Sequence, residues 1–159
     1  MSCLLAIDPG LSTLGWAFFE GGELKDCGLS RTVAKDLYSR IEHHRASVRR
    51  YSDLGPVVVE RMAWRGKHNK GNPQDLMDLS LLAGALGTHW LLPGEWKGSV
   101  PRDVEQQRSE AALNDYERSL LGAVRPASEA HNAWSAVGIG LSALGRAHSG
   151  KARGRFLLR

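Results

Sequence analysis

Two short apolar runs, each ending in an acidic residue, define the predicted centre of this chain. Cys3 to Ile7 is continuously apolar and is followed by the turn residues Asp8-Pro9-Gly10, a pattern typical of a strand buried on both faces. Val57 to Val59 is a β-branched run that ends in Glu60 and predicts a second buried strand. Each of these two strands therefore carries a carboxylate at its C-terminal end.

The remaining pattern predicts an α/β domain with a mixed sheet. Gly21-Gly22 favours a hairpin turn between two further strands, and the Asn72-Pro73 pair supplies N-cap and first-turn chemistry for a leucine-rich helix. We expect one domain over residues 1–147 and a basic tail over 148–159. The predicted strands are 3–7, 13–19, 24–29, 57–60 and 88–92, and the predicted helices are 33–51, 73–86, 101–119 and 127–146.

Asp8 and Glu60 are the first candidates for a functional site. Active sites of open α/β sheets lie beyond the C-terminal ends of the strands, so the two carboxylates are expected to converge there. A carboxylate at the end of a buried strand is costly unless a positive group, such as a divalent ion, shares the site. The alternative is that Asp8 only caps the turn that follows it.

Composition narrows the class of protein. The chain has 159 residues, 42% hydrophobic and 24% charged, which is ordinary for one globular domain, and its net charge is +4. This basic balance fits a polyanionic partner without requiring one. Two cysteines, Cys3 and Cys27, are too few for a disulfide framework and favour a reduced, cytoplasmic protein. No signal peptide is predicted, and the longest apolar stretch, 79–87, is too short to span a membrane.

Basic residues gather in three segments that suit contact with nucleic acid. The loop after Glu60 mixes cations with apolar side chains that can stack on bases. A helix start near residue 101 offers a site where backbone N–H groups and cations can bind phosphate. The third segment is the basic tail, 148–159, whose charge would strengthen binding. The alternative for each segment is a solvated surface with its aromatic side chain packed on the core. The candidate DNA-binding residues are Arg61, Met62, Trp64, Arg65, Lys67, Lys70, Lys97, Arg102, Lys151, Arg153 and Arg155.

In their order along the chain, these motifs resemble the RuvC-type Holliday junction resolvases of the RNase H-like nuclease superfamily. Ile7-Asp8-Pro9-Gly10 with Gly15-Trp16-Ala17 looks like the opening motif, and Val58-Val59-Glu60 is similar to the second acidic strand. The helix after Asn72-Pro73 resembles the family's dimer helix. The segment from Pro93 to Arg108, with Trp96-Lys97 as its landmark, resembles the viral branch, and 129–141 resembles the terminal helix that carries the remaining acidic ligands.

The resemblance implies an RNase H-like fold and a homodimer that cleaves four-way DNA junctions with two Mg²⁺ ions, or Mn²⁺ as a substitute, per site. Asp8 would bridge both ions, Glu60 would hold one, and Lys97 or Arg102 would steady the developing charge. The last helix would complete the second metal site through a set of polar residues at its start. No membrane and no small-molecule cofactor are implied. The members of that polar set are Glu129, His131, Asn132 and Ser135.

The last helix departs from the family pattern, because Asn132 stands where an aspartate is expected and Ser135 is not acidic. Two interpretations are open: a natural variant in which Glu129 or His131 compensates, or an engineered Asp→Asn form that is inactive. Other functions also remain. They are an RNase H-like nuclease acting on other branched DNA or on hybrids, and a junction-binding protein without catalysis. An actin-like kinase is disfavoured, because the chain is about half the size of that two-lobed fold.

Overall fold

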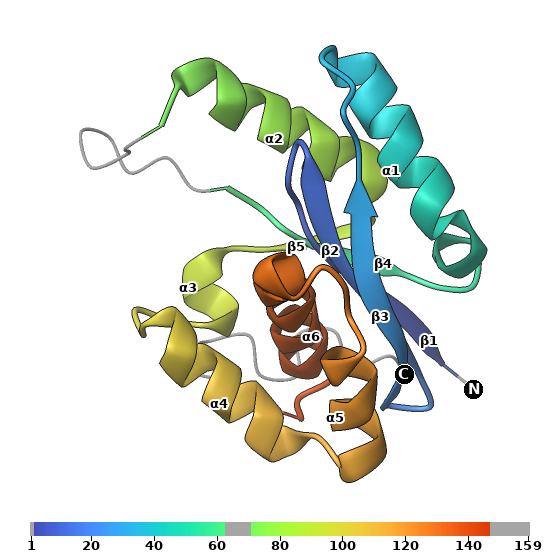
Figure 1. The fold of residues 1–159 in the computed structure, drawn as a ribbon, viewed down its shortest axis with the longest axis vertical. Helices are drawn as coiled ribbons and strands as arrows, with labels where there is room; N and C mark the ends of the chain where they lie inside the picture. Colours follow the sequence, from blue (N-terminus) through green and yellow to red (C-terminus); the bar gives the residue numbers. More distant parts are fainter. Residues whose placement is uncertain (1, 63–70, 147–159) are drawn as a thin grey trace.

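A mixed five-stranded sheet forms the centre of the molecule (Figure 1). The structure is a computed structural model and describes residues 2–62 and 71–146. The strand order is β3-β2-β1-β4-β5, with antiparallel pairing among the first three strands of the chain and parallel pairing of β1 with β4 and of β4 with β5. This confirms the predicted mixed sheet. The strands are β1 (Cys3–Asp8), β2 (Thr13–Glu20), β3 (Glu23–Arg31), β4 (Val57–Glu60) and β5 (His89–Leu91).

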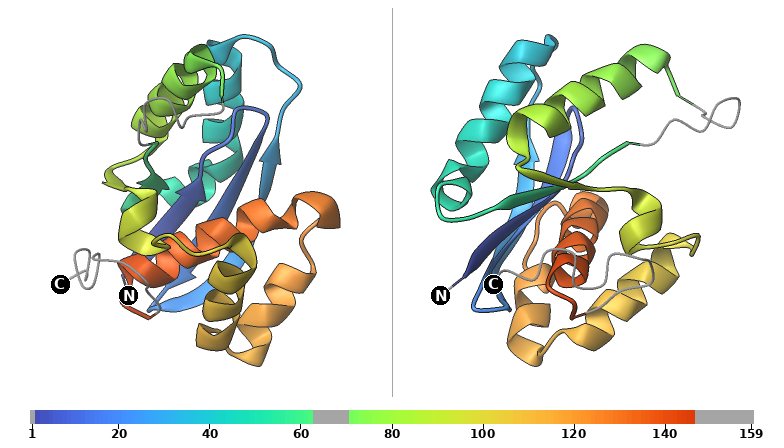
Figure 2. Two further views of the ribbon diagram at one scale, coloured as in Figure 1. Left: turned by 90° about the vertical axis from the view of Figure 1, so that its left-hand side faces the viewer. Right: turned by 180° about the vertical axis from the view of Figure 1, so that it is seen from behind.

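Helices cover both faces of the sheet (Figures 1 and 2). Helices α1 and α2 lie on one face, whereas α6 crosses β1, β2 and β3 on the other face with α4 and α5 packed beside it. Among the described residues, no helix is long and apolar enough to cross a membrane. The helices are α1 (Leu37–Ser52), α2 (Pro73–Leu86), α3 (Pro93–Trp96), α4 (Arg102–Ala112), α5 (Asp115–Gly122), a 3-10 turn (Ala127–Glu129) and α6 (Ala130–Ala143).

The alternation of side chains along the central strands produces two separate cores. Leu4 and Ala6 of β1 pack in the core under α6, whereas Leu5 and Ile7 pack in the core under α1 and α2. All four are essentially inaccessible to solvent. This double burial explains the unbroken apolar sequence of β1, since neither face of the strand meets water.

The single helix predicted over 101–119 is wrong, because the chain breaks into α4 and α5 at Leu113-Asn114. The Asn114 side chain accepts a hydrogen bond from the Glu117 N–H at 2.9 Å, and Glu117 Oε2 accepts one from the Asn114 N–H at 2.9 Å. This reciprocal capping box satisfies two backbone donors and starts a new helix. The short helix α3 was also not predicted. The predicted tail, 148–159, lies outside the described residues.

An ion pair between buried Glu117 and partly buried Arg146 joins three elements on the α6 side. Glu117 accepts hydrogen bonds from both terminal nitrogens of Arg146, at 2.6 and 2.9 Å, and from the Leu24 N–H at 2.8 Å. Arg146 also donates to the Gly22 and Ala112 carbonyls. Burial opposes ionisation of Glu117, but these donors outweigh it and lower its pKa to about 2. The pair connects α5, the β2–β3 hairpin and the end of α6.

A buried histidine holds helix α1 against the loop that follows Asp8. His44 is fully buried, and its Nε2 lies 3.1 Å from the Leu11 carbonyl, which can only accept a hydrogen bond. Nδ1 therefore accepts from the Ser30 hydroxyl at 2.7 Å, and the ring is neutral. Burial lowers the pKa of His44. The buried histidine thus connects Ser30 of β3 to the loop after Asp8, and its Nδ1 contact requires the neutral ring.

Candidate active site

Asp8 and Glu60 lie at neighbouring ends of parallel strands and face the same side of the sheet. The register pairs Ile7 with Val59, so Asp8 and Glu60 are the next positions along β1 and β4. Asp8 follows Ala6 by two residues, and Glu60 follows Val58 by two; Ala6 and Val58 both pack in the α6 core. Because side chains alternate along a strand, both carboxylates point toward the α6 face. The predicted convergence of these two acids therefore has a structural basis.

Two donors from the segment after β5 bind one oxygen of Glu60. Trp96 Nε1 donates to Glu60 Oε2 at 2.6 Å, and Lys97 Nζ lies 3.2 Å from the same oxygen. The lysine ammonium also sits 4.8 Å from the centre of the Trp96 ring. Trp96 is buried, and the Glu60 side chain is only 8% exposed. These contacts fix the position of Glu60 and neutralise its charge.

A third carboxylate, Glu105, enters the site from α4. Its side chain is 6% exposed, and Oε1 is a buried atom without a hydrogen-bond partner in the described part of the chain. A Cβ placed on Gly138 of α6 would lie 2.6 Å from Glu105 Oε1 and 2.6 Å from the Trp96 ring. Glycine at 138 therefore lets α4 and Trp96 approach α6 closely, and Glu105 and Trp96 share this point of contact.

The charges of this cluster act on one another. Burial, followed by the Glu60 carboxylate, raises the pKa of Asp8 to about 8, while Lys97 and Arg102 act in the opposite direction. Burial also raises the pKa of Glu105 to about 7, with Lys97 again opposing. Asp8 and Glu105 are thus poorly neutralised by the protein alone. Strongly raised acidic pKa values in such a cluster are typical of functional sites.

The start of α6 lies at the same end of the sheet. Gly15 pairs with Asp8 across β1 and β2, and a Cβ on Gly15 would lie 2.0 Å from the Asn132 carbonyl oxygen. Asn132 thus sits over the strand position beside Asp8. Ser135 follows one turn later on α6, and both residues are partly buried. His131, also partly buried, is next to Asn132 in the first turn of the helix.

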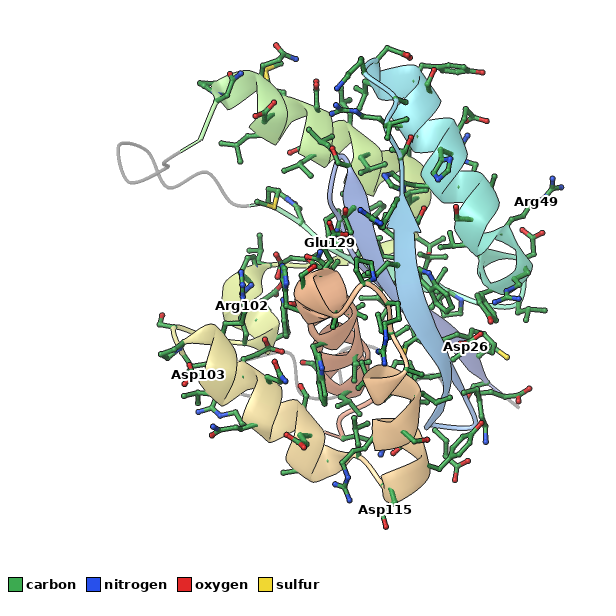
Figure 3. All side chains as sticks on the ribbon, in the orientation of Figure 1. Asp26, Arg49, Arg102, Asp103, Asp115 and Glu129 are labelled. Atoms are coloured by element: carbon green, nitrogen blue, oxygen red, sulfur yellow. The ribbon has the colours of Figure 1, made fainter. Side chains whose placement is uncertain are left out.

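Glu129 is directed toward the other strands. Its Oε2 accepts a hydrogen bond from Thr13 Oγ1 at 3.1 Å and lies 3.0 Å from Arg31 Nε. These partners belong to β2 and β3, whereas Glu60 belongs to β4 on the opposite side of β1. Figure 3 shows Glu129 at the start of α6 and Arg102 at the start of α4. Glu129 therefore fixes the start of α6 to the hairpin.

The loop after β4 is described only at its beginning. The Arg61 N–H donates to the Leu91 carbonyl at 2.8 Å and extends the sheet, and its side chain is exposed. Arg61 and Met62 border a groove of about 710 Å³ whose other wall is α2. The α2 side chains of this wall include Met77 and Leu81, which are 61% and 57% exposed. Lys97 and Arg102 belong to the described residues, and the remaining predicted DNA-binding residues lie outside them: Trp64, Arg65, Lys67, Lys70, Lys151, Arg153 and Arg155.

The chemistry of the donors fits a divalent ion that binds oxygen. Asp8 and Glu60 are hard carboxylate ligands on adjacent strands, and Asn132, whose side chain carries a neutral amide oxygen, stands at the start of α6 above the neighbouring strand β2. Within 2–62 and 71–146, however, no cluster of three or more His, Cys, Asp or Glu side chains is close enough to hold a metal. Mg²⁺ is commonly held by one or two carboxylates together with substrate phosphates. The residues present therefore fit an ion that is bound jointly with a phosphate.

Two residues of this cluster were missed as site residues in the sequence. Trp96 was noted only as a landmark, and nothing in the pattern places its indole on Glu60. Glu105 had no sequence signal either, because only the structure shows that the buried positions of α4 are Glu105 and Ser109, four residues apart. A helix that packs through polar residues is unusual, and its polar face is a reason to suspect a functional environment.

Comparisons with known proteins agree with this architecture. No protein-family model matches the chain. The structure of Thermus thermophilus RuvC is similar at a TM-score of 0.53 and 15% identity, covering 92% of this chain and 98% of that one. T. thermophilus RuvC in complex with a Holliday junction substrate gives a TM-score of 0.52 at 14% identity, with the same coverage. The chain therefore has a RuvC-like fold.

A short sequence match points to another nuclease. A segment of 29 residues, 18% of this chain, is 59% identical to the CRISPR-associated endonuclease Cas9 of Campylobacter jejuni. The match spans only 3% of that much longer protein. It therefore describes a local similarity and leaves the activity of the whole chain to be argued from its site.

Proposed function

We propose that this protein is a metal-dependent endonuclease that cleaves branched DNA, with the four-way junction as its preferred substrate. The observation that carries the proposal is the pair of carboxylates, Asp8 and Glu60, at adjacent strand ends of a RuvC-like fold. The relative solved with a Holliday junction supports the choice of substrate. The resemblance of the Trp96-Lys97 segment to the viral branch stays a prediction.

In this mechanism, the protein positions a phosphodiester against the strand ends. Asp8 and Glu60 would hold Mg²⁺, or Mn²⁺ in its place, and Asn132 and Ser135 would be the neutral oxygen donors from α6. When bound, such ions, two per site in the family mechanism, activate the attacking water and stabilise the leaving oxygen. Lys97 and Arg102 lie at the rim of the acidic cluster, where their positive charges attract the scissile phosphate.

A homodimer places two sites on one junction. The outer face of α2 exposes Met77 and Leu81 beside the groove, and apolar side chains gathered on one helix suit a self-complementary interface. Replacing both residues by lysine is expected to give a monomer in analytical ultracentrifugation while the circular dichroism spectrum stays unchanged. A wild-type chain that sediments as a monomer at every concentration tested would contradict this part of the proposal.

A second function is favoured by the composition of α6. With Asn132 and Ser135 in place of acids, the site has fewer negative ligands than the family pattern, as a junction-binding protein without catalysis would. Glu129 does not compensate simply, because Arg31 and Thr13 already bind its carboxylate. The two functions share the DNA-binding surface and differ only in cleavage.

The test compares substrates and variants in one assay. End-labelled four-way junction, flap, duplex and RNA–DNA hybrid are incubated with the wild type, D8N and N132D in Mg²⁺ or Mn²⁺. The proposal expects cleavage of the junction that D8N abolishes. Cleavage by N132D alone would indicate an inactivated form, whereas junction binding without cleavage by any form would establish the binding protein. Preferential cutting of the hybrid would overturn the choice of substrate.

A further inference from the structure

Glu60 has an unusual environment for a metal ligand, because a lysine of the same chain already forms an ion pair with its carboxylate. Oε2 lies 2.6 Å from Trp96 Nε1 and 3.2 Å from Lys97 Nζ. A carboxylate oxygen has about two lone-pair sites, so these two donors fill the acceptor capacity of Oε2. A cation that binds through this oxygen must therefore displace one of them.

The two donors differ in how easily they can leave. Trp96 is 3% exposed and is wedged against Gly138 of α6, where the space for its ring depends on the missing Cβ. Lys97 follows α3, its side chain is 33% exposed, and its ammonium rests over the indole ring at the open side of the cluster. A lysine has a flexible four-carbon stem and a compact charge. Lys97 is therefore the donor that can move.

The other charges of the cluster give Lys97 a reason to stay until another cation arrives. Its ammonium acts electrostatically on Asp8 and Glu105 as well as on Glu60, and on Asp8 and Glu105 its effect exceeds that of Arg102, so it is a shared counter-charge for three carboxylates. A divalent ion would bring twice that charge to the same place. Lys97 and the ion would then repel each other, and the ammonium would be driven outward, toward the side from which DNA approaches.

We propose that Lys97 is a displaceable counter-cation: it pairs with Glu60 in the metal-free protein and moves to a DNA phosphate when a divalent ion binds. This inference rests on the proposed function and concerns the regulation of that same site. Lys97 then couples the two ligands, because the ion frees the ammonium that the phosphate needs. By linkage, DNA and the ion each strengthen the binding of the other. Trp96 keeps Glu60 in place during the exchange.

The first test measures ion binding without DNA. Calorimetric titration with Mn²⁺ compares the wild type with K97M and with the control K25M, which removes an exposed lysine paired with Glu23 on β3. We expect K97M to bind Mn²⁺ about tenfold more tightly, a typical size for coupling between sites, and K25M to match the wild type. Equal affinity of K97M and the wild type would overturn the inference.

The second test separates displacement from simple charge repulsion. Fluorescence anisotropy of a labelled four-way junction is recorded over a range of NaCl, in EDTA and in Ca²⁺, with gels confirming intact strands. In Ca²⁺, the plot of log K against log [NaCl] is expected to be steeper for the wild type than for K97M by about 0.9, the value of one phosphate contact. In EDTA the two slopes should agree, because Lys97 then stays on Glu60.

These measurements separate a failure of the Lys97 exchange from a failure of the proposed function. A slope difference of the same size in EDTA and Ca²⁺ would make Lys97 a permanent phosphate contact and overturn the exchange, while the proposed function stands. Failure of the wild type and of both variants to bind Mn²⁺ or the junction would overturn the proposed function itself, and the inference with it. K97R provides a check on folding, since it keeps the charge and should retain the Ca²⁺-dependent slope.

Discussion

Replacing Asp8 by asparagine should stabilise the protein while abolishing its activity. The carboxylate is held where burial and Glu60 raise its pKa from 3.8 to about 8, so the folded protein resists its ionisation. The folded state favours protonated Asp8. The contribution of this residue to the free energy of unfolding is therefore lost as the pH rises from about 4 to about 8. Asparagine is neutral throughout and avoids this loss.

The magnitude follows from the same values. At 1.36 kcal/mol per pH unit, the interval from 3.8 to pH 7 corresponds to about 4 kcal/mol of lost stability. The asparagine amide must still satisfy its own hydrogen bonds in a partly buried position, which offsets part of the gain. We therefore expect D8N to unfold at a free energy about 2 kcal/mol higher than the wild type at pH 7.

The assay is urea unfolding followed by circular dichroism in EDTA at pH 4.5, 6 and 8. The gain from D8N should be smallest at pH 4.5 and largest at pH 8. Saturating Mg²⁺ should reduce the difference in free energy of unfolding between D8N and the wild type, because the ion stabilises only the folded wild type. D115N is the matched control, since Asp115 carries the same charge at a side chain that is 99% exposed and should show no growth with pH. A gain that is constant with pH, or a loss, would refute the electrostatic reasoning.

Three further predictions concern contacts that stabilise the fold around the site. R146M leaves buried Glu117 without its partner and should lower the free energy of unfolding by about 3–5 kcal/mol in urea, and the contribution of Glu117 should fade as the pH falls from 4.5 toward 2. Protonation of His44 puts a proton on Nδ1, which can then no longer accept from the Ser30 hydroxyl, and places a charge in a fully buried site. Because its folded pKa lies below 6.5, the melting temperature should drop below pH 6.5 in the wild type and drop less in H44Q. G15A puts a methyl group into the α6 backbone and should lower the melting temperature by about 8 °C or more, whereas G84A, which meets no neighbour, should not lower it.

The sequence was most informative where burial is complete. The apolar runs before Asp8 and Glu60 could be identified because both strands are covered on both faces, which leaves no polar position until the strand ends. The acids then stand out as the first polar residues at the sheet edge. Their common direction could not be predicted from the runs alone, since it depends on the register between β1 and β4.

The sequence was least informative where a contact depends on tertiary packing. The indole of Trp96 reaches Glu60 only because Gly138 lets the ring approach α6, and no local pattern records that approach. The break before α5 had a visible signal, the Asn114 and Glu117 capping pair, but a continuous helix fitted the spacing of the other residues equally well.

The most direct test of the central claim is the mapping of nicks on a four-way junction in Mg²⁺. Wild type, D8N and E60Q are compared on one junction labelled in turn on each strand. The account predicts paired nicks at symmetric positions on two opposing strands with the wild type, and none with either variant although both still bind the junction. Nicks that persist in D8N and E60Q would show that the chemistry lies elsewhere and would contradict the assignment of this site.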